Sequence, residues 1–570
     1  MHTPLVVAVT GHRDIVPAEV ASIQASTHAF FTDLRERFPE LPIQLMSPLA
    51  EGAGRIVAQV ALALGIELII PLPMPRDAYA DDFDTDSALQ EFDTLCSRGE
   101  VIELPLVAGN TLESIRYQGP ERTLQYAQLG VFLSSHCQIL LALWDGKEIN
   151  QLGGTSQVVR FHLTDTMPGF ADRPLDTSQL LAGNENDLVY HIVCSREQRH
   201  GTMVEGLTPG DAGYFTSSSY LELAEQMPET YVRIFHQMES YNRDVRRYVT
   251  ENGQESLVDE SSGIEVGEAA RLIDQYFVIA NQLATIFQGR VHFSLRTIYT
   301  LAVLLGLSFL FYSDFENMEY MIWVFLLFFA SGVALFLVAR RLDWHRKYLD
   351  YRALAEGLRV LFYWRIVGVT DESGTAFIHD NFLQKQDIEV GWIRNVMRVV
   401  GLTTRKYDGK PNAAGLNYAI EHWIGEQGAG GEGQLSYYAA TAEARARLHR
   451  LTQGLGLACI WVGILIAVLL ALGGESVSGS MQTLLIALMG GFPLIAAVRE
   501  AYAHKKADKE LIKQYRFMHR LFFSARQRLD EATDDDQKRA ILRALGEAAM
   551  DEHAEWILMH RERPLEQSKW

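Results

Sequence analysis

The chain has few cysteines, and none of its residue patterns is typical of a metal site. Its four cysteines are far apart and form no C-x-x-C pair: Cys96, Cys137, Cys194 and Cys459. This spacing argues against a disulfide framework and a zinc site, and it is typical of proteins in a reducing compartment. The 17 histidines form no H-E-x-x-H or comparable arrangement. We therefore expect no metal cofactor.

Positive charge is also scarce. The chain has 51 Lys and Arg residues against 71 Asp and Glu residues, which gives a formal net charge of −20. The field of such a molecule repels polyanions, so the composition argues against a nucleic-acid polymer as a partner. A phosphate ligand would need a local group of donors.

Charged residues are absent from four long apolar segments. Asp, Glu, Lys and Arg are all missing from residues 297–313, 321–339, 455–472 and 481–498. A helix crosses a hydrocarbon core of about 30 Å with roughly 17 to 25 apolar residues, so each segment can span a bilayer. The alternative is four helices buried in a soluble core. We predict two transmembrane hairpins.

Basic residues flank these segments on one side only. Lys and Arg precede the first and third segments and follow the second and fourth, whereas the loops 314–320 and 473–480 contain neither. The positive-inside rule then places both loops outside and both termini in the cytoplasm, as expected for a bacterial inner-membrane protein. Because the spans hold no ionisable side chain, a transporter or proton relay is disfavoured.

The two hairpins have the pattern of an internal repeat. Each has a charged amphipathic approach, at 267–290 and 439–451, and each ends in a long charged helix, at 340–364 and 499–529. The first of these helices carries an apolar stripe at three- and four-residue spacing: Trp344, Tyr348, Tyr351, Leu354, Leu358 and Leu361. Such a stripe needs a partner, either within the chain or on a neighbouring subunit.

The first 200 residues alternate between short apolar runs and helix-length segments. The runs are 5–9, 43–46, 67–71, 101–106 and 138–143, with a further strand expected at 188–194 and an irregular stretch at 202–219. This rhythm predicts a Rossmann-like α/β domain with a parallel sheet covered on both faces. Ligands of such sheets bind at the carboxyl ends of the strands.

Glycines follow several of these expected strands. A phosphate can approach backbone N–H groups closely where glycine removes the Cβ, and a following helix adds its dipole. The residues that meet this description are Gly11, Gly52, Gly153, Gly154 and Thr155. Each glycine could instead form a tight turn. These positions form neither the dinucleotide fingerprint nor a Walker A loop.

Side chains beside these glycines are further candidates. Arg13 and Arg55 are the best phosphate partners in this acidic chain, with surface ion pairs as the alternative. His12 could contact a ligand or cap the backbone. No Ser-His-Asp or Cys-His arrangement can be defended, so no catalytic residue is assigned.

The N-terminal region resembles the SLOG superfamily of Rossmann-like proteins, which includes the LOG-type phosphoribohydrolases. The resemblance rests on Gly11-His12-Arg13, residues 47–55 and 142–146, and Gly153-Gly154-Thr155. It implies a pocket for a nucleotide or ADP-ribose-like signalling ligand, with phosphate at 153–156. The site residues that it implies are Gly11, His12, Arg13, Ser47, Glu51, Gly52, Arg55, Asp145, Gly146, Gly153, Gly154, Thr155 and Ser156.

The catalytic loop of that superfamily is incomplete in this chain. LOG enzymes carry P-G-G-x-G-T-x-x-E, whose glutamate assists N-glycosidic cleavage, whereas residues 150–161 read NQLGGTSQVVRF. Glu51 or Asp145 could still supply a carboxylate. The resemblance therefore implies binding and puts hydrolysis in doubt. A membrane-anchored LOG-type N-glycosidase, or a membrane scaffold with a structural α/β domain, is the alternative.

The membrane half resembles the SLATT family, in which an apolar hairpin leads into a long cytoplasmic helix. The resemblance covers about 267–366 and, more loosely, 439–529. It implies a homo-oligomeric, pore-forming or membrane-disrupting effector of the kind found in bacterial antiphage defence. Combined with the SLOG resemblance, it implies that a nucleotide second messenger controls the effector.

We expect five regions along the chain. Residues 1–200 form the nucleotide-binding domain, and 201–294 form a helical connector. The first hairpin and its cytoplasmic helix occupy 295–407, and the second hairpin and its helices occupy 436–570. The glycine-rich stretch 408–435 between them is expected to be a flexible linker.

Overall fold

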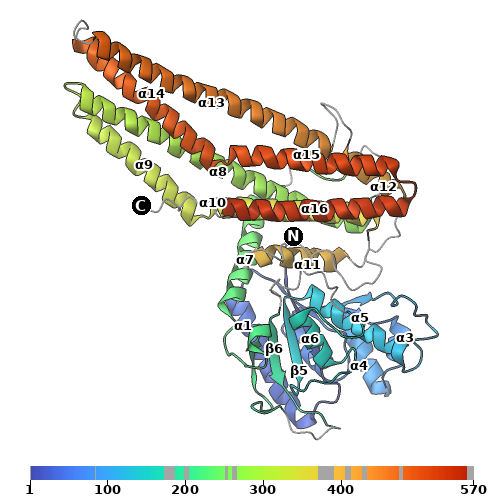
Figure 1. Cartoon of the computed structure of the whole chain (residues 1–570). Helices are drawn as coiled ribbons and strands as arrows, with labels where there is room; N and C mark the ends of the chain where they lie inside the picture. The colour runs from blue at the N-terminus through green and yellow to red at the C-terminus, as the bar shows by residue number, and fades with distance from the viewer. Residues whose placement is uncertain are drawn as a thin grey trace.

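The computed structural model describes residues 2–83, 85–171, 187–197, 204–250, 255–259, 266–369, 390–404, 413–425, 433–473 and 479–561. An α/β domain lies at one end of the molecule, and a bundle of long helices lies at the other (Figure 1). Helix α11 (Gly391–Thr404) lies between the two. The expected fold class, a Rossmann-like domain followed by an all-helical region, is confirmed.

The described residues of the N-terminal domain form a seven-stranded sheet in the order β4-β3-β2-β1-β5-β6-β7. The strands are β1 (Leu5–Gly11), β2 (Ile43–Met46), β3 (Glu67–Leu72), β4 (Glu100–Glu103), β5 (Ile139–Trp144), β6 (Val189–Val193) and β7 (Ala212–Phe215). All neighbours are parallel except β6 and β7. The six strands expected from sequence are present, but the prediction that 202–219 is irregular was wrong for 212–219, where β7 and a short 3-10 helix form.

Strand β7 extends the α/β domain beyond the expected boundary at residue 200. Its sequence, AGYF, is short and contains a glycine, so it has no apolar alternation of useful length. It forms because it pairs antiparallel with the edge of β6, from Val189 opposite Phe215 to Ile192 opposite Ala212. Tertiary pairing therefore decides this strand, and local propensity does not.

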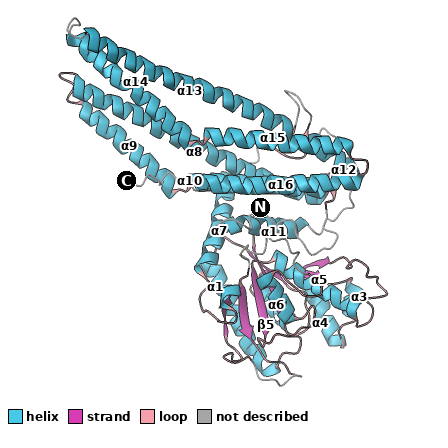
Figure 2. Ribbon diagram, viewed as in Figure 1, coloured by secondary structure: helices cyan, strands magenta, loops and turns pink. Residues whose placement is uncertain are grey.

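Helices cover both faces of the sheet (Figure 2). Alternate residues of a strand point to opposite faces, so Val7 packs with one core and its neighbour Val6 with the other. The first face is covered by α1 (Val20–Arg37), α2 (Ala53–Ala63), α4 (Asp86–Cys96) and α7 (Glu229–Tyr248). The second is covered by α5 (Pro120–His136) and α6 (Thr155–Thr164). Short helix α3 (Arg76–Ala80) follows β3.

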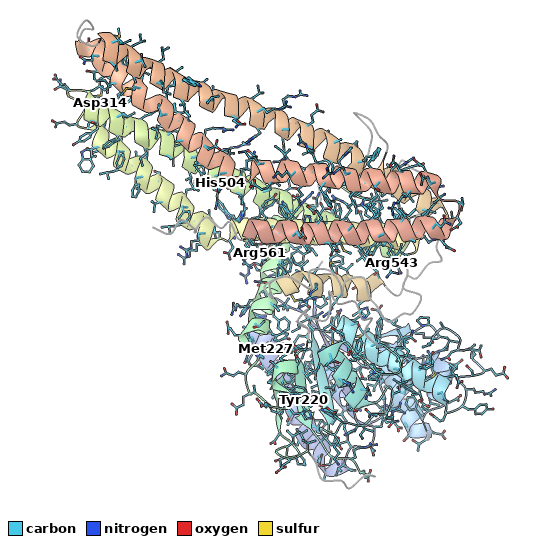
Figure 3. All side chains as sticks on the ribbon, viewed as in Figure 1. Tyr220, Met227, Asp314, His504, Arg543 and Arg561 are labelled. Carbon is cyan, nitrogen blue, oxygen red and sulfur yellow. The ribbon has the colours of Figure 1, made fainter. Side chains whose placement is uncertain are left out.

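Four helices in the described part of the chain are long and apolar enough to cross a membrane. They form two hairpins, α8 (Glu268–Asp314) with α9 (Met321–Arg341), and α13 (Gln434–Gly473) with α14 (Gly479–Lys505). Figure 3 shows Asp314 at the far tip of the hairpins and His504 where α14 meets the rest of the bundle. Helices α8 and α13 begin well before their apolar segments, so each also contributes to the polar part of the bundle.

The expected repeat is present in the backbone. Helix α9 is followed by α10 (Trp344–Val367), and α14 is followed by α15 (Asp508–Glu531). At each break one residue adopts the left-handed conformation, Asp343 at φ 51° and Ala507 at φ 53°. The N–H of each residue bonds the carbonyl three residues earlier, at Arg340 and His504. Each hairpin therefore leads into its following helix through the same kind of turn.

Part of the expected flexible linker is ordered helix. Helix α12 (Ala413–Tyr418) runs into a π-helical turn at Ala419–Ile424, and Trp423 is buried with its ring stacked 5.1 Å from that of Tyr363. The prediction of a flexible linker was therefore wrong for 413–425. The glycine-rich residues 426–432 lie outside the described residues.

Helix α7 joins the sheet to the helical bundle. The side chain of Asn242 accepts a bond from the Thr3 N–H at 2.9 Å and donates to the Thr3 carbonyl at 3.0 Å. Two residues further along, Asp244 accepts bonds from Lys347 and Tyr351 of α10, each at 2.6 Å. The expected helical connector is thus bonded to both parts through side chains on one helix.

Two buried histidines should make the sheet domain acid-sensitive. His162 and His191 each place Nε2 near a carbonyl, Leu188 O at 3.1 Å and Trp144 O at 3.0 Å. Burial lowers the pKa of both imidazoles from 6.5 to about 4. Between these values the unfolded state binds more protons, so the free energy of unfolding falls as pH falls from 6.5 to 4. The loss should be roughly 3 kcal/mol per histidine.

Hydrogen exchange of β5 and β6 in the full chain, corrected for the intrinsic pH dependence of exchange, would measure this loss. His162→Gln and His191→Gln keep a donor without the titration and should flatten the pH dependence. His28→Gln, at an exposed position of α1, is the matched control. An unchanged pH dependence in the double variant would contradict the assignment.

Candidate ligand site at the switch point of the sheet

The order of the strands creates a crevice between β1 and β5. The chain runs outward from β1 through β2, β3 and β4, then crosses to the other side of β1 to form β5. At such a switch point the loops after the two strands diverge, and ligands of α/β sheets bind at their carboxyl ends. His12 follows β1, and Asp145 follows β5.

These two residues are bonded across the switch point. The Asp145 N–H donates to His12 Nε2 at 3.1 Å, and the same nitrogen lies 3.3 Å from Asp145 Oδ1. Burial raises the pKa of the Asp145 carboxyl, but the neighbouring His12 side chain and the bond from the Lys147 N–H lower it, and the net direction is down. Asp145 therefore holds His12 in place, and this pair lies at the carboxyl ends of β1 and β5.

Four of the candidate glycines have packing reasons for their identity. A Cβ at Gly11 would lie 2.4 Å from that of Ala53, and one at Gly52 would lie 2.4 Å from the Arg13 carbonyl. A Cβ at Gly153 would lie 2.8 Å from that of Tyr126, and one at Gly146 would lie 2.7 Å from a Leu207 methyl carbon. Close approach to neighbouring elements explains Gly11, Gly52 and Gly153, and a left-handed backbone with φ 79° explains Gly146, so none of the four needs a ligand to account for it.

Gly154 differs from the other four. Its φ of −77° and ψ of 162° suit any residue, and the nearest atoms to a Cβ there all belong to Gln151, with the carbonyl oxygen at 3.0 Å. It is the N-cap of α6, and among the described residues the backbone N–H groups of Thr155 and Ser156 have no acceptor. Two free donors and the helix dipole leave a position suited to phosphate at this end of α6.

Arg13 and Arg55, the two candidate arginines, have different environments. Arg55 is buried, donates to the Leu49 carbonyl at 3.1 Å and pairs with Glu91 at 2.8 Å. Arg13 has a side chain that is 48 % exposed, and its nearest carboxylate, Asp82, is 3.9 Å away. Arg55 therefore braces the loop after β2, which holds Leu49 at a φ of 56°. Arg13 is the arginine available to an anion.

The remaining candidates divide between structural and open roles. Ser47 is buried, accepting from the Leu49 N–H and donating to the Gly54 carbonyl. Ser156 Oγ donates to the Ile149 carbonyl at 2.7 Å and so ties the loop that precedes α6. Glu51 is partly exposed at the start of α2 and could reach a ligand near Arg13.

The structure adds Tyr126 to the site, which sequence reasoning did not find. The guanidinium of Arg13 lies 5.2 Å from the centre of the Tyr126 ring, and Gly153 packs against the Cβ of the same residue. Tyr126 therefore brings together Arg13 and the start of α6. Its position on α5, far in sequence from both, carries no motif, so only the fold could reveal it.

Unpaired polar atoms surround this point. Tyr126 Oη, Asp82 Oδ2 and Arg55 Nη2 are buried, and none has a hydrogen-bond partner among the described residues. Asp82 itself is held by the buried Arg122, whose Nη2 lies 2.8 Å from Oδ1. Buried groups without partners are costly in a folded protein, so they favour a site that a polar ligand would complete.

Comparison with known protein families, with characterised proteins and with solved structures finds no match for this chain. The geometry alone supports an anion near Arg13 and the N-terminus of α6, with His12 and Asp145 beside it. The described residues contain no group of three or more His, Cys, Asp or Glu that could hold a metal ion.

Gly154→Ala should weaken phosphate binding without unfolding the domain. The added methyl group would occupy the approach to the Thr155 and Ser156 N–H groups, and alanine at an N-cap costs about 1 kcal/mol or less relative to glycine. Gly119→Ala is the matched control, because Gly119 is the N-cap of α5 and a Cβ there meets no backbone atom within 4 Å. Calorimetric titration with a panel of nucleotides that includes ADP-ribose would measure the effect. Full affinity in Gly154→Ala would remove the phosphate assignment.

Proposed function

We propose that this chain is a membrane effector controlled by a nucleotide-derived second messenger. The messenger binds the SLOG-like α/β domain, and binding changes the packing or assembly of the two SLATT-like hairpins so that the bacterial inner membrane is perturbed, in antiphage defence. The observation that carries the proposal is the pairing of an anion-suited crevice with four apolar helices in one tightly packed chain.

Helix α5 offers a route from the crevice to the bundle. Tyr126, near its start, lies against Arg13, and the helix packs against α11. Val399 and Leu402 of α11 are buried in the same core as α5 and α6. Since α11 also packs against α7, α8 and α10, a shift of α5 on ligand binding would reach helices that lead into both ends of the first hairpin.

A binding role agrees better with the residues of α6 than a hydrolytic role. The first turns of this helix present Thr155, Ser156 and Gln157, and none is a carboxylate. Asp145 is held by His12 and by Lys147, whose Nζ lies 3.7 Å from Oδ2. General acid or base catalysis needs a carboxyl free to exchange a proton with substrate, and Asp145 is engaged in orienting its neighbours.

Assembly of several copies would use surfaces other than the apolar stripe of α10. Leu354 and Leu358 are fully buried within the chain, so the bundle itself is the partner of that stripe. Large apolar side chains are exposed instead on α9 and α13, among them Trp323 at 73 % and Leu465 at 58 %. These faces can meet lipid or a second copy. A homo-oligomer formed through them would perturb lipid without a charged pathway inside one protomer.

The hairpin tips should be accessible only from outside the cell. Cysteine introduced at Asn317 or Ser480 should react with an impermeant thiol reagent in intact cells, because the Lys and Arg residues flank the opposite ends of these helices. Cysteine at Ser97 or Asp534 should react only after lysis. All four positions can be tested in a chain in which the native cysteines are replaced. Labelling of Ser97→Cys from outside would overturn the topology.

Liposomes that contain the protein should leak only when the messenger is present. A ligand shifts an equilibrium by the difference between its affinities for the two states, and a hundredfold difference supplies about 2.7 kcal/mol per site. Several sites per assembly would give a steep dose response. Dye release during titration with a panel of cyclic nucleotides and ADP-ribose derivatives would measure it.

The same variants serve as controls for leakage. Gly154→Ala should abolish ligand-dependent dye release, and Gly119→Ala should retain it. Leakage without any ligand, or leakage that survives Gly154→Ala, would contradict control by the α/β domain. Leakage proportional to ligand and protein concentration would contradict assembly.

A further inference from the structure

A polar cavity of about 130 Å³ lies inside the cytoplasmic part of the helical bundle. It is lined by α8, α10, α13, α15 and α16 (Asp535–Arg561). Helices α8 and α10 belong to the first hairpin unit, and α13 and α15 belong to the second. The cavity therefore lies where the two units of the repeat meet, and α16 contributes to its lining.

Positive charge is in excess on α10 at this cavity, where Arg352 and Glu356 belong to the lining and Arg359 adjoins it. Glu356 is shared by two arginines, with Arg352 at 2.8 Å and Arg359 at 2.5 Å. Burial raises the pKa of the Glu356 carboxyl, but the two arginines lower this pKa by more than burial raises it, and the result is a pKa of about 2. The carboxylate is thus ionised and neutralises only one of its partners. Nε of Arg359 is buried without an acceptor among the described residues.

A further arginine enters from the opposite unit. Arg445 of α13 lines the cavity with its guanidinium 5.3 Å from the centre of the Tyr515 ring. Among the described residues no carboxylate lies within 4.0 Å of it, whereas Arg447, two positions later, pairs with Glu443. An arginine stacked on an aromatic ring and lacking an acid partner keeps its five donors available to a ligand.

Most of the other polar groups in the lining can donate a hydrogen bond to a ligand. Tyr437, Tyr438 and Tyr515 contribute hydroxyl groups that make no hydrogen bond within the described part of the chain. Glu552 is the remaining carboxyl of the lining, and burial together with the nearby Glu555 raises its pKa to about 7. At neutral pH it therefore supplies only part of a negative charge, and the cavity as a whole is positive in a chain of net charge −20.

We propose that this cavity binds the phosphate group of a small molecule or of a lipid headgroup. Arg445 and Arg352 supply the charge, and the tyrosine hydroxyls supply neutral donors of the kind that complete a phosphate site. A lipid headgroup could reach the cavity as well as a small molecule, because Arg445 lies only about 15 Å along α13 from the apolar segment of that helix. The site is separate from the crevice of the α/β domain, and it would hold the two hairpin units together.

The test is a titration of the full chain, in detergent and phosphate-free buffer, with inorganic phosphate. Arg445→Gln should weaken binding about tenfold, since it removes one charged donor. Glu552→Gln should strengthen binding roughly threefold, because it removes partial negative charge from the lining. The control is Arg447→Gln on the same helix, where the side chain is 70 % exposed. Effects of opposite sign from two single substitutions are not expected from misfolding.

Two further arms separate the sources and the sites. Dihexanoyl phosphatidylglycerol that binds in an Arg445-dependent manner, when inorganic phosphate does not, would identify the ligand as a lipid headgroup. Gly154→Ala should leave binding at the bundle unchanged. If Gly154→Ala removes all phosphate binding, the bundle site is overturned while the proposed function stands. Binding that is absent from both probes, or equal in the wild type and Arg445→Gln, would also overturn it.

Discussion

The architecture depends on the polar face of α7, which is bonded to the sheet on one side and to the bundle on the other. Asn242 bonds both backbone groups of Thr3, and Asp244 accepts from Lys347 and Tyr351. Asp244 is buried, so removal of its cation would leave an unpaired charge, which typically costs about 3 to 5 kcal/mol. Two residues, two positions apart on the helix, thus bond the α/β domain to the helical bundle.

The charged side chains of the helical bundle lie outside its four apolar segments. Helices α8 and α13 run unbroken from the polar part of the bundle into apolar spans, so the backbone bonds of these two spans are made within a helix. The charged side chains lie outside the apolar spans, in pairs such as Arg352 with Glu356. The packing of the polar part of the bundle therefore also affects how the spans approach one another.

The fold was largely predictable from the sequence, because its signals are periodic. Continuous apolar runs such as LVVAV predict buried strands, and the four long uncharged segments predict long apolar helices. The structure has strands and long helices at those positions. The exceptions depend on tertiary partners. Strand β7 forms only by pairing with β6, and Trp423 orders part of the expected linker by stacking on Tyr363.

The candidate site was less predictable than the fold. Sequence reasoning found His12, Arg13 and Gly154, which follow strands or open a helix. It also assigned ligand contact to Gly11 and Arg55, whose environments are explained by close packing and by a buried ion pair. Tyr126 was missed because it is brought to the crevice by a helix with no motif. A single sequence reveals which residues end strands, but not which of them face a neighbour.

The length of α8 has a mechanical consequence. With 47 residues, this helix extends about 70 Å from the polar part of the bundle to the tip of the first hairpin. If the whole helix pivots at its first residue, a tilt of about 5° would displace the opposite tip by about 6 Å, close to the pitch of one helical turn. A small tilt of α8 at its first residue would therefore become a displacement of several ångströms at the tip of the first hairpin.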